Sequence, residues 1–259
     1  MTLPLFFGDP TRQLFGVYHA AAEGGAADRA VVLCAPSPQE YMPTHWAYRR
    51  LAALLARAGV HVLRFDYFGM GDSAGASDEG TLDGWLEDIA AAERTLRELS
   101  GARRTSLVGY RLGAVLAWRA CKSLENRPRD LVLWDPVVRG TDYLTELHVT
   151  DRKFASRLLY FPPLPWPAPE LTAHPLSTEQ RLATESVDLA REPLPAATRV
   201  HMYVSRETAD TRTLAQRLGR EVKRFSFAHV PEEGAQGTGS LLSARVLQVI
   251  STAVSSGAA

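Results

Sequence analysis

The residue best placed to do chemistry is Arg111. It follows a short apolar run and is flanked by Gly109 and Gly113, a pattern that predicts a strand, a tight turn and a helix that folds back closely on the strand. A guanidinium stays protonated and cannot attack a carbonyl group, but it can hold a carboxylate, phosphate or enolate oxygen. The backbone N–H of Leu112 and another from the loop near Ser37 would add donors. These residues therefore predict an anion site.

A buried arginine requires a nearby carboxylate, because removing the partner of a buried cation is strongly destabilising. Glu40, just after Ser37, is the first expected partner, and Asp135, which follows a predicted strand, is the second. Two interpretations stay open. In the first, Arg111 stabilises negative charge on a ligand. In the second, the ion pair itself fills the site.

Histidine is the side chain best suited to proton transfer near neutral pH, and His229 lies two positions after the end of the last predicted strand. Glu207 and Asp210 follow the strand before it, and either carboxylate could orient the histidine. The plain alternatives are a strand-end histidine and two solvated loop acids.

Two further groups of polar residues carry hypotheses. Ser37 is an alternative nucleophile, although it lacks the sharp turn that would present its hydroxyl. Asp66, Asp72 and Ser73 lie in a glycine-rich loop, and we expect them to cap turns and brace that loop rather than to take part in a reaction.

Alternating strands and helices must position these residues. The N-terminal residues predict a hairpin over 5–19, with a turn at 8–10. Further strands are predicted at 30–34, 60–65, 105–108, 131–134, 200–204 and 222–227, and helices at 45–58, 81–99, 112–124, 211–218 and 241–254. This order predicts an α/β fold with a mostly parallel central sheet and helices on both faces.

The alternation stops between residues 137 and 195. Prolines gather there among the aromatic residues Tyr160, Phe161 and Trp166, so this segment cannot be the interior of a sheet. We expect a single domain over 1–259 in which residues 137–195 form a small cap. Residues 161–166 could then serve as an apolar lid for an acyl or aromatic group.

Composition excludes several classes of protein. The 259 residues contain 29 Lys+Arg and 29 Asp+Glu, and 46% are apolar, so the chain can fold around a core and has no electrostatic signature of nucleic-acid binding. We expect no signal peptide and no membrane span. Cys34 and Cys121 are expected to be reduced core thiols without metal-ligand spacing. We therefore expect a cytoplasmic protein with no metal or cofactor.

Two segments together carry a family resemblance. Residues 64–75 (RFDYFGMGDSAG) and 108–114 (VGYRLGA) resemble the post-strand loop and the nucleophile elbow of α/β-hydrolases of the serine-aminopeptidase type, and the order of elements is similar over essentially the whole chain. The Gly-x-Arg-Leu-Gly elbow, Pro36, Glu40 and residues 134–140 (WDPVVRG) are similar to the exosortase-system-associated hydrolases. The resemblance implies an oxyanion hole and a late histidine. It also implies a serine at the position of Arg111, and here the chain departs from the family.

Three functions follow. The first is binding of, or action on, an acyl, ester or carboxylate-bearing small molecule without serine-nucleophile hydrolysis. Lyase or acyl-transfer chemistry would fit, in a natural-product or exopolysaccharide pathway, on a ligand that is free or attached to a carrier protein. The second is a catalytically inactive pseudo-hydrolase that serves as a binding or partner protein. The third is an esterase or thioesterase with a displaced nucleophile such as Ser37.

Overall fold

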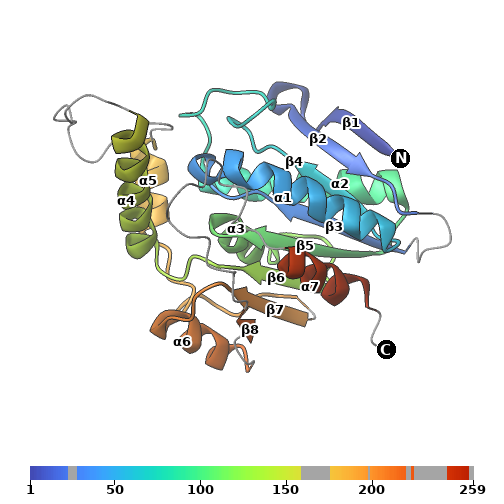
Figure 1. Ribbon diagram of the computed structural model, residues 1–259. Helices are drawn as coiled ribbons and strands as arrows, with labels where there is room; N and C mark the ends of the chain where they lie inside the picture. Colours follow the sequence, from blue (N-terminus) through green and yellow to red (C-terminus); the bar gives the residue numbers. More distant parts are fainter. Residues whose placement is uncertain (23–27, 159–175, 198, 220–222, 225–243, 257–259) are drawn as a thin grey trace.

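A central sheet organises the chain. The computed structural model describes residues 1–22, 28–158, 176–197, 199–219, 223–224 and 244–256. Eight strands in these ranges form one sheet with the order β1-β2-β4-β3-β5-β6-β7-β8 (Figure 1). The strands are β1 (Thr2–Phe7), β2 (Leu14–His19), β3 (Arg29–Cys34), β4 (His61–Phe65), β5 (Arg104–Tyr110), β6 (Asp130–Trp134), β7 (Arg199–Val204) and β8 (Lys223–Arg224). Only the β1–β2 and β2–β4 pairs are antiparallel, so the predicted α/β fold is confirmed.

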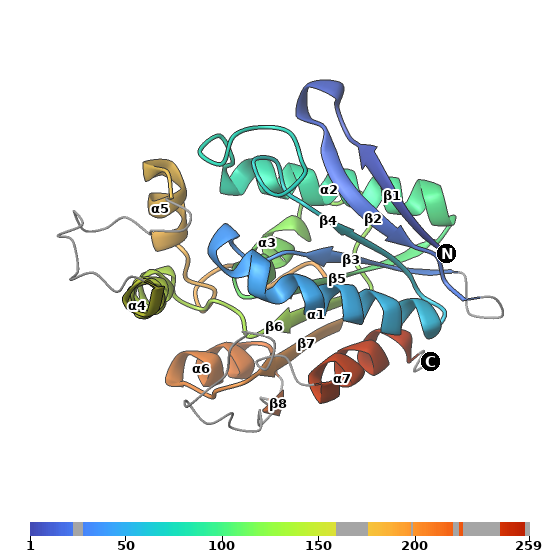
Figure 2. The same cartoon turned by 45° about the horizontal axis from the view of Figure 1, so that its top comes forward.

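Helices cover both faces of the sheet. The helices of the described ranges are α1 (Pro38–Arg57), α2 (Leu82–Ser100), α3 (Leu112–Ala120), α4 (Gly140–Leu158), α5 (Thr178–Glu185), α6 (Ala209–Arg217) and α7 (Ala244–Ser255). A short 3₁₀ turn, Pro10–Arg12, lies in the hairpin. α1 and α7 pack together on one face, whereas α2 and α3 lie on the other (Figures 1 and 2).

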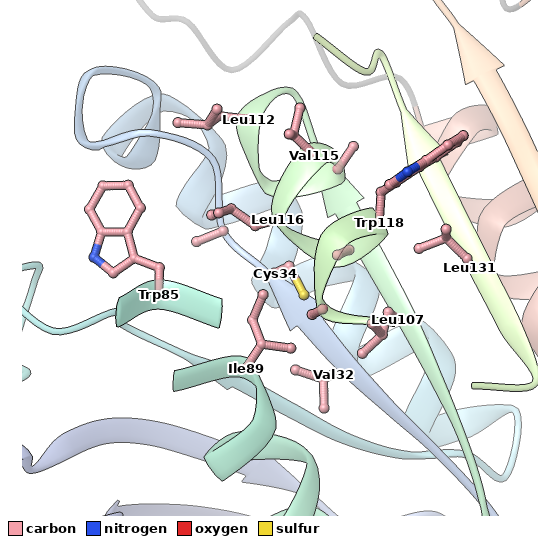
Figure 3. Packing of buried hydrophobic residues seen from close by; sticks show 14 of the residues in the cluster. Val32, Cys34, Trp85, Ile89, Leu107, Leu112, Val115, Leu116, Trp118 and Leu131 are labelled. Atoms are coloured by element: carbon pink, nitrogen blue, oxygen red, sulfur yellow. The ribbon is translucent and has the colours of Figure 1, made fainter. Parts of the chain in front are cut away.

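The alternation of side chains along β3 explains the two cores. Val31 and Leu33 pack beneath α1 and α7, whereas Val32 and Cys34 face α2 and α3. Figure 3 shows the second core, with large side chains from α2 and α3 around Cys34. Because both faces are covered, the inner strands β3 and β6 are apolar at every position after their first residue.

Helix α1 begins earlier than predicted. The predicted start at residue 45 is wrong, since the helix runs from Pro38 with Ser37 as its N-cap residue. Proline fits the first helical turn, where its missing N–H is not needed. The early start matters because it puts Glu40 in the first turn of a rigid helix. The predicted end of α3 at residue 124 is also wrong, because the helix ends at Ala120.

The glycine-rich loop after β4 is braced by Asp66. One carboxylate oxygen of Asp66 accepts the backbone N–H of Asp72 at 3.0 Å, and the hydroxyl of Ser73 donates to the Asp66 carbonyl at 2.6 Å. The same hydroxyl accepts the backbone N–H of Phe15 at 2.9 Å, which ties the loop to β2. The predicted bracing is confirmed for Asp66 and Ser73, and Asp72 contributes to it through its backbone N–H.

Helices α4 and α5 stand between β6 and β7 in the chain and contact each other. The proline-rich stretch with Phe161 and Trp166 lies outside the described residues, so a single domain with a cap over 137–195 stays a prediction. Cys34 and Cys121 are buried free thiols. Within the described ranges, no helix has the length and apolar character needed to cross a membrane.

Stability should depend on pH through His19, at the end of β2. Burial lowers the pKa of His19 from 6.5 to about 4, and the charge of Arg64 acts in the same direction. Arg64 Nε also donates to Nε2 of His19 at 3.3 Å, a bond that a protonated ring could not accept. Between these pKa values, protonation favours the unfolded chain. The free energy of unfolding should therefore decrease as the pH is lowered from about 6.5 towards 4, and His19 should account for about 2 kcal/mol of this decrease.

Urea unfolding at about pH 7 and about pH 4.5 measures this effect. His19→Gln should unfold with a smaller difference between the two pH values than the unchanged protein. An identical difference in both proteins would contradict the assignment to His19.

Candidate functional site

The turn between β5 and α3 holds Arg111 in a strained conformation. Its φ is 54° and its ψ is −118°, and within the described ranges Asp135 is the only other non-glycine residue with positive φ. Close packing explains the flanking glycines. A Cβ on Gly109 would lie 2.2 Å from the carbonyl oxygen of Gly113, and one on Gly113 would lie 2.3 Å from the carbonyl of Cys34. The turn therefore presses α3 against the sheet and fixes the position of Arg111.

Two carboxylates from different helices hold the guanidinium of Arg111. Nε donates to Oε1 of Glu40 on α1 at 3.0 Å, and Nη2 donates to Oε2 of Glu146 on α4 at 2.6 Å. The guanidinium carbon also lies 5.0 Å from the centre of the Tyr143 ring. The side chains of Arg111 and Glu40 are 17% and 18% exposed, whereas that of Glu146 is 52% exposed. Glu40, the first expected partner, thus forms the inner contact, and Glu146 forms the outer one.

A chain of hydrogen bonds continues from Glu40 to the loop after β3. The Tyr143 hydroxyl lies 2.6 Å from Oε2 of Glu40 and 2.7 Å from Oγ of Ser37. A tyrosine has one hydroxyl proton, and an ionised carboxylate can only accept. Tyr143 therefore donates to Glu40 and accepts from Ser37. The hydroxyl of Ser37 is buried and already bonded.

The pKa values reflect the burial of this cluster. Burial alone lowers the pKa of Arg111, but the charges of Glu40 and Glu146 outweigh it and raise the pKa above the ordinary value. Burial raises the pKa of Glu40, against the opposing effects of Arg111 and of the bond from Tyr143. Burial also raises the pKa of Tyr143 well above 10, so this hydroxyl stays neutral. With both glutamates ionised, the Arg111 cluster carries one excess negative charge.

Asp135, the second expected partner of Arg111, has other partners. It follows β6 with a φ of 43°, and its carboxylate accepts the hydroxyl of Ser205 at 2.8 Å as well as the backbone N–H of that residue. Burial raises the pKa of Asp135, although these bonds favour the ionised form. This acid links the ends of β6 and β7.

The expected proton-transfer residues are not gathered at Arg111 in the described structure. Glu207 lies 3.4 Å from Arg212, and Asp210 lies 3.0 Å from Arg139, both in ion pairs near the start of α6. His229 lies outside the described residues. The roles of all three stay predictions.

The proposed oxyanion donors come from two helix starts. Leu112 is the first residue of α3 and is buried, and Ser37 caps α1. The first N–H groups of a helix have no acceptor within the helix, so the N–H of Leu112 is not used inside α3. A role in binding stays a prediction for both.

Two residues of this cluster, Tyr143 and Glu146, were not predicted. They are three positions apart on α4, a spacing that places both on one side of a helix. That periodicity is visible in the sequence, but nothing local indicates that this side faces the β5–α3 turn.

A small cavity lies near this turn but does not reach Arg111. Its volume is about 20 Å³, enough for one water molecule, and its lining includes Tyr41, His45 and Asp66. Among the described residues, no three His, Cys, Asp or Glu side chains are close enough together to hold a metal ion.

Comparison with known proteins identifies the family. A sequence profile for the "Alpha/beta hydrolase family" matches residues 21–243, which is most of the chain. The chain belongs to the alpha/beta hydrolase family. A search of curated protein sequences gave no significant match.

Solved structures share the alpha/beta hydrolase fold at low identity. Est1E from Butyrivibrio proteoclasticus with ferulic acid bound is 13% identical, with a TM-score of 0.67 over 97% of this chain and 96% of that one. A putative hydrolase from Agrobacterium vitis S4 is 20% identical, with a TM-score of 0.60 over 98% and 97%. A monoacylglycerol lipase from Paleococcus ferrophilus is 16% identical, with a TM-score of 0.60 over 93% and 98%. At such identities the likeness shows the fold alone.

The two carboxylates on Arg111 should contribute unequally to stability. Glu40→Gln should lower the free energy of unfolding by about 1–3 kcal/mol, because the buried cation loses its inner partner. Glu146→Gln should cost at most about 1 kcal/mol, because that ion pair is half exposed. Chemical denaturation of the two variants measures both values.

A double-mutant cycle provides the control. Glu40→Gln should cost less when Arg111→Gln is already present, because the two residues are in direct contact. Equal losses for Glu40→Gln and Glu146→Gln, or strict additivity with Arg111→Gln, would argue against an inner and an outer partner.

Proposed function

We propose that this chain binds an acyl- or carboxylate-bearing small molecule beside Arg111 and does not use a serine nucleophile there. Alpha/beta hydrolases carry their nucleophile at the turn between a strand and the next helix. Here the β5–α3 turn has that backbone shape, and its side chain is a guanidinium. An arginine cannot form an acyl-enzyme, but it can hold a negatively charged oxygen.

The outer contact of Arg111 is the observation that supports this proposal. Nη2 is paired with a carboxylate that is half exposed and belongs to α4, whereas Nε is held by the buried Glu40. A ligand carboxylate that displaced Glu146 would make the same charge-assisted contact without disturbing the inner pair. Glu146 would then act as an internal competitor for the ligand.

Lyase or acyl-transfer chemistry would also require a proton path. The hydroxyls of Ser37 and Tyr143 connect to Glu40, which accepts the last hydrogen bond of the chain. The raised pKa of Glu40 brings its protonated form closer to neutral pH, which favours proton exchange at this carboxylate. His229 remains the proposed second proton carrier.

Calorimetric measurement of octanoate binding tests the proposal. Methyl octanoate, which has the same acyl chain without the charge, is the control ligand. The unchanged protein should bind octanoate. Glu146→Gln should bind it up to about fivefold more tightly, because a half-exposed ion pair worth up to about 1 kcal/mol no longer competes. Arg111→Gln should lose at least about tenfold in affinity, since a hydrogen bond to a charged group is worth about 1.5–3 kcal/mol.

Arg181→Gln is the matched control and should bind as the unchanged protein does, because this arginine lies on α5 and pairs with Glu185 of the same helix. Octanoate binding that is equal in the Arg111→Gln variant would overturn the proposal. So would an absence of binding in the Glu146→Gln variant.

A pseudo-hydrolase that binds a partner protein is the second candidate. It is favoured by the two ion pairs of the guanidinium, which occupy Nε and Nη2 while Glu146 stays in place. Arg111→Ser separates it from a site whose other catalytic groups are intact. Esterase activity in this variant would indicate that His229 and an acid are aligned, whereas a folded, inactive variant would favour the pseudo-hydrolase.

The displaced nucleophile Ser37 is tested separately. Its buried hydroxyl already donates to Tyr143, an arrangement that does not favour attack on a substrate. Fluorophosphonate should therefore leave the folded protein unlabelled. Labelling that disappears in Ser37→Ala would support the hydrolase instead.

A further inference from the structure

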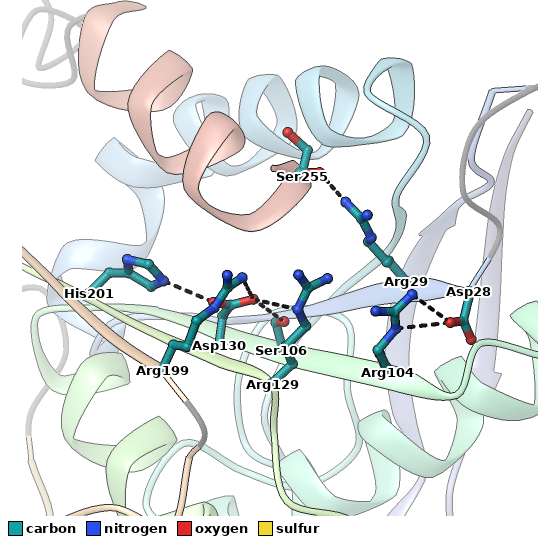
Figure 4. A network of polar contacts seen from close by, with 9 residues as sticks. All are labelled: Asp28, Arg29, Arg104, Ser106, Arg129, Asp130, Arg199, His201 and Ser255. Atoms are coloured by element: carbon teal, nitrogen blue, oxygen red, sulfur yellow. Dashed lines mark hydrogen bonds and ion pairs between the residues drawn. The ribbon is translucent and has the colours of Figure 1, made fainter. Parts of the chain in front are cut away.

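A row of arginines lies where the parallel strands of the sheet begin, at the opposite ends of the strands from Arg111. We call this row of strand ends the arginine edge. Arg29 begins β3, Arg104 begins β5, Arg129 directly precedes β6 and Arg199 begins β7. These strands are neighbours in the sheet, and the register sets Arg29 opposite Arg104 (Figure 4). Neighbouring strands lie about 4.8 Å apart, so the row concentrates positive charge along one short edge.

Nearby carboxylates compensate only part of this charge. Asp28 pairs with Arg104 at 2.8 Å and with Arg103 at 3.2 Å. Asp130 is fully buried and pairs with Arg199 at 2.7 Å, while Nε of Arg129 lies 3.8 Å from it. Within this group, five guanidinium groups face two carboxylates. The edge therefore carries a positive excess in a chain whose formal net charge is zero.

Two donors in the row have no acceptor among the described residues. Nη1 of Arg129 and Nε of Arg29 are buried without a hydrogen-bond partner. Arg29 uses another nitrogen to donate to the carbonyl of Ser255, at the end of α7. Buried donors without partners are costly, and so is the proximity of like charges. Burial and the charges of Arg199, Arg29 and Arg104 together lower the pKa of Arg129.

We propose that this edge is a binding site for a multivalent oxyanion of the phosphate class, with Arg129 and Arg104 as its principal ligands. A phosphate group has several acceptor oxygens and more than one negative charge, which match the unpaired donors and the excess of guanidinium groups. Access is through Arg104, whose side chain is 48% exposed, and through Arg103, which is 86% exposed. The site is separate from the β5–α3 turn, because the row stands at the start of β5 and Arg111 follows its end.

Thermal unfolding with inorganic pyrophosphate tests the site, against sodium chloride at the same ionic strength. The melting temperature of the unchanged protein should rise with saturation, by about 2–5 °C at ten times the dissociation constant. Arg129→Gln and Arg104→Gln should each lose most of this rise. Arg104 is half exposed, so its variant decides the result if Arg129→Gln fails to fold.

Arg181→Gln again serves as the control. Arg181 lies on α5, so the melting temperature of this variant should show the full rise with pyrophosphate. No rise in the unchanged protein would overturn the proposal. The same would follow from equal rises in the Arg104→Gln and Arg181→Gln variants, which would indicate a general salt effect. A melting temperature that rises with an aspartate oligomer but not with pyrophosphate would overturn the proposal of a small oxyanion. It would indicate that the site binds an acidic protein surface.

Discussion

The ion pair between Arg111 and Glu40 is the contact on which the rest of this region depends. A permanent cation sits on a backbone of positive φ between a central strand and a buried helix. It needs a carboxylate at that place, and the first turn of α1 supplies it. Tyr143 then bonds to the second oxygen of Glu40 and covers the guanidinium with its ring. The strand, two covering helices and α4 thus converge on one pair of opposite charges.

Under the proposed function, this chain keeps the fold of its family without the family's serine chemistry. The sheet order, the sharp turn and the close glycine contacts are those of an alpha/beta hydrolase, and all of them can be explained by packing alone. The side chain at the turn is the guanidinium of Arg111, whose charge cannot be removed, whereas a serine nucleophile is a neutral hydroxyl with a removable proton. Electrostatic attraction, rather than covalent attack, is what such a turn can offer to a ligand.

The sequence predicted local features well and distant contacts only in part, because Glu40 was expected beside Arg111 and Glu146 was not. Apolar β-branched runs marked the central strands, and the spacing of Gly109 and Gly113 marked the turn, since both patterns come from adjacent residues. The start of α1 was misplaced because the apolar spacing that predicted this helix begins only at residue 45. Its first turns begin at Pro38, and proline is well tolerated at the beginning of a helix. Glu146 could not be found, because its contact with the turn depends on how α4 returns to the body of the protein.

The position of Glu40 within α1 limits which chain lengths this region can accept. Thr44, one turn later, donates to the carbonyl of Glu40 at 2.8 Å, and Tyr48, another turn on, donates to the carbonyl of Cys34 at 2.7 Å. The first bond lies within α1, and the second fixes the rotation of the helix against β3. Inserting or deleting one residue near its beginning would turn Glu40 by about 100° around the helix axis and carry it away from the arginine. Relatives that keep both charges should therefore show no length variation there, whereas the half-exposed partner on α4 leaves more freedom on the opposite side.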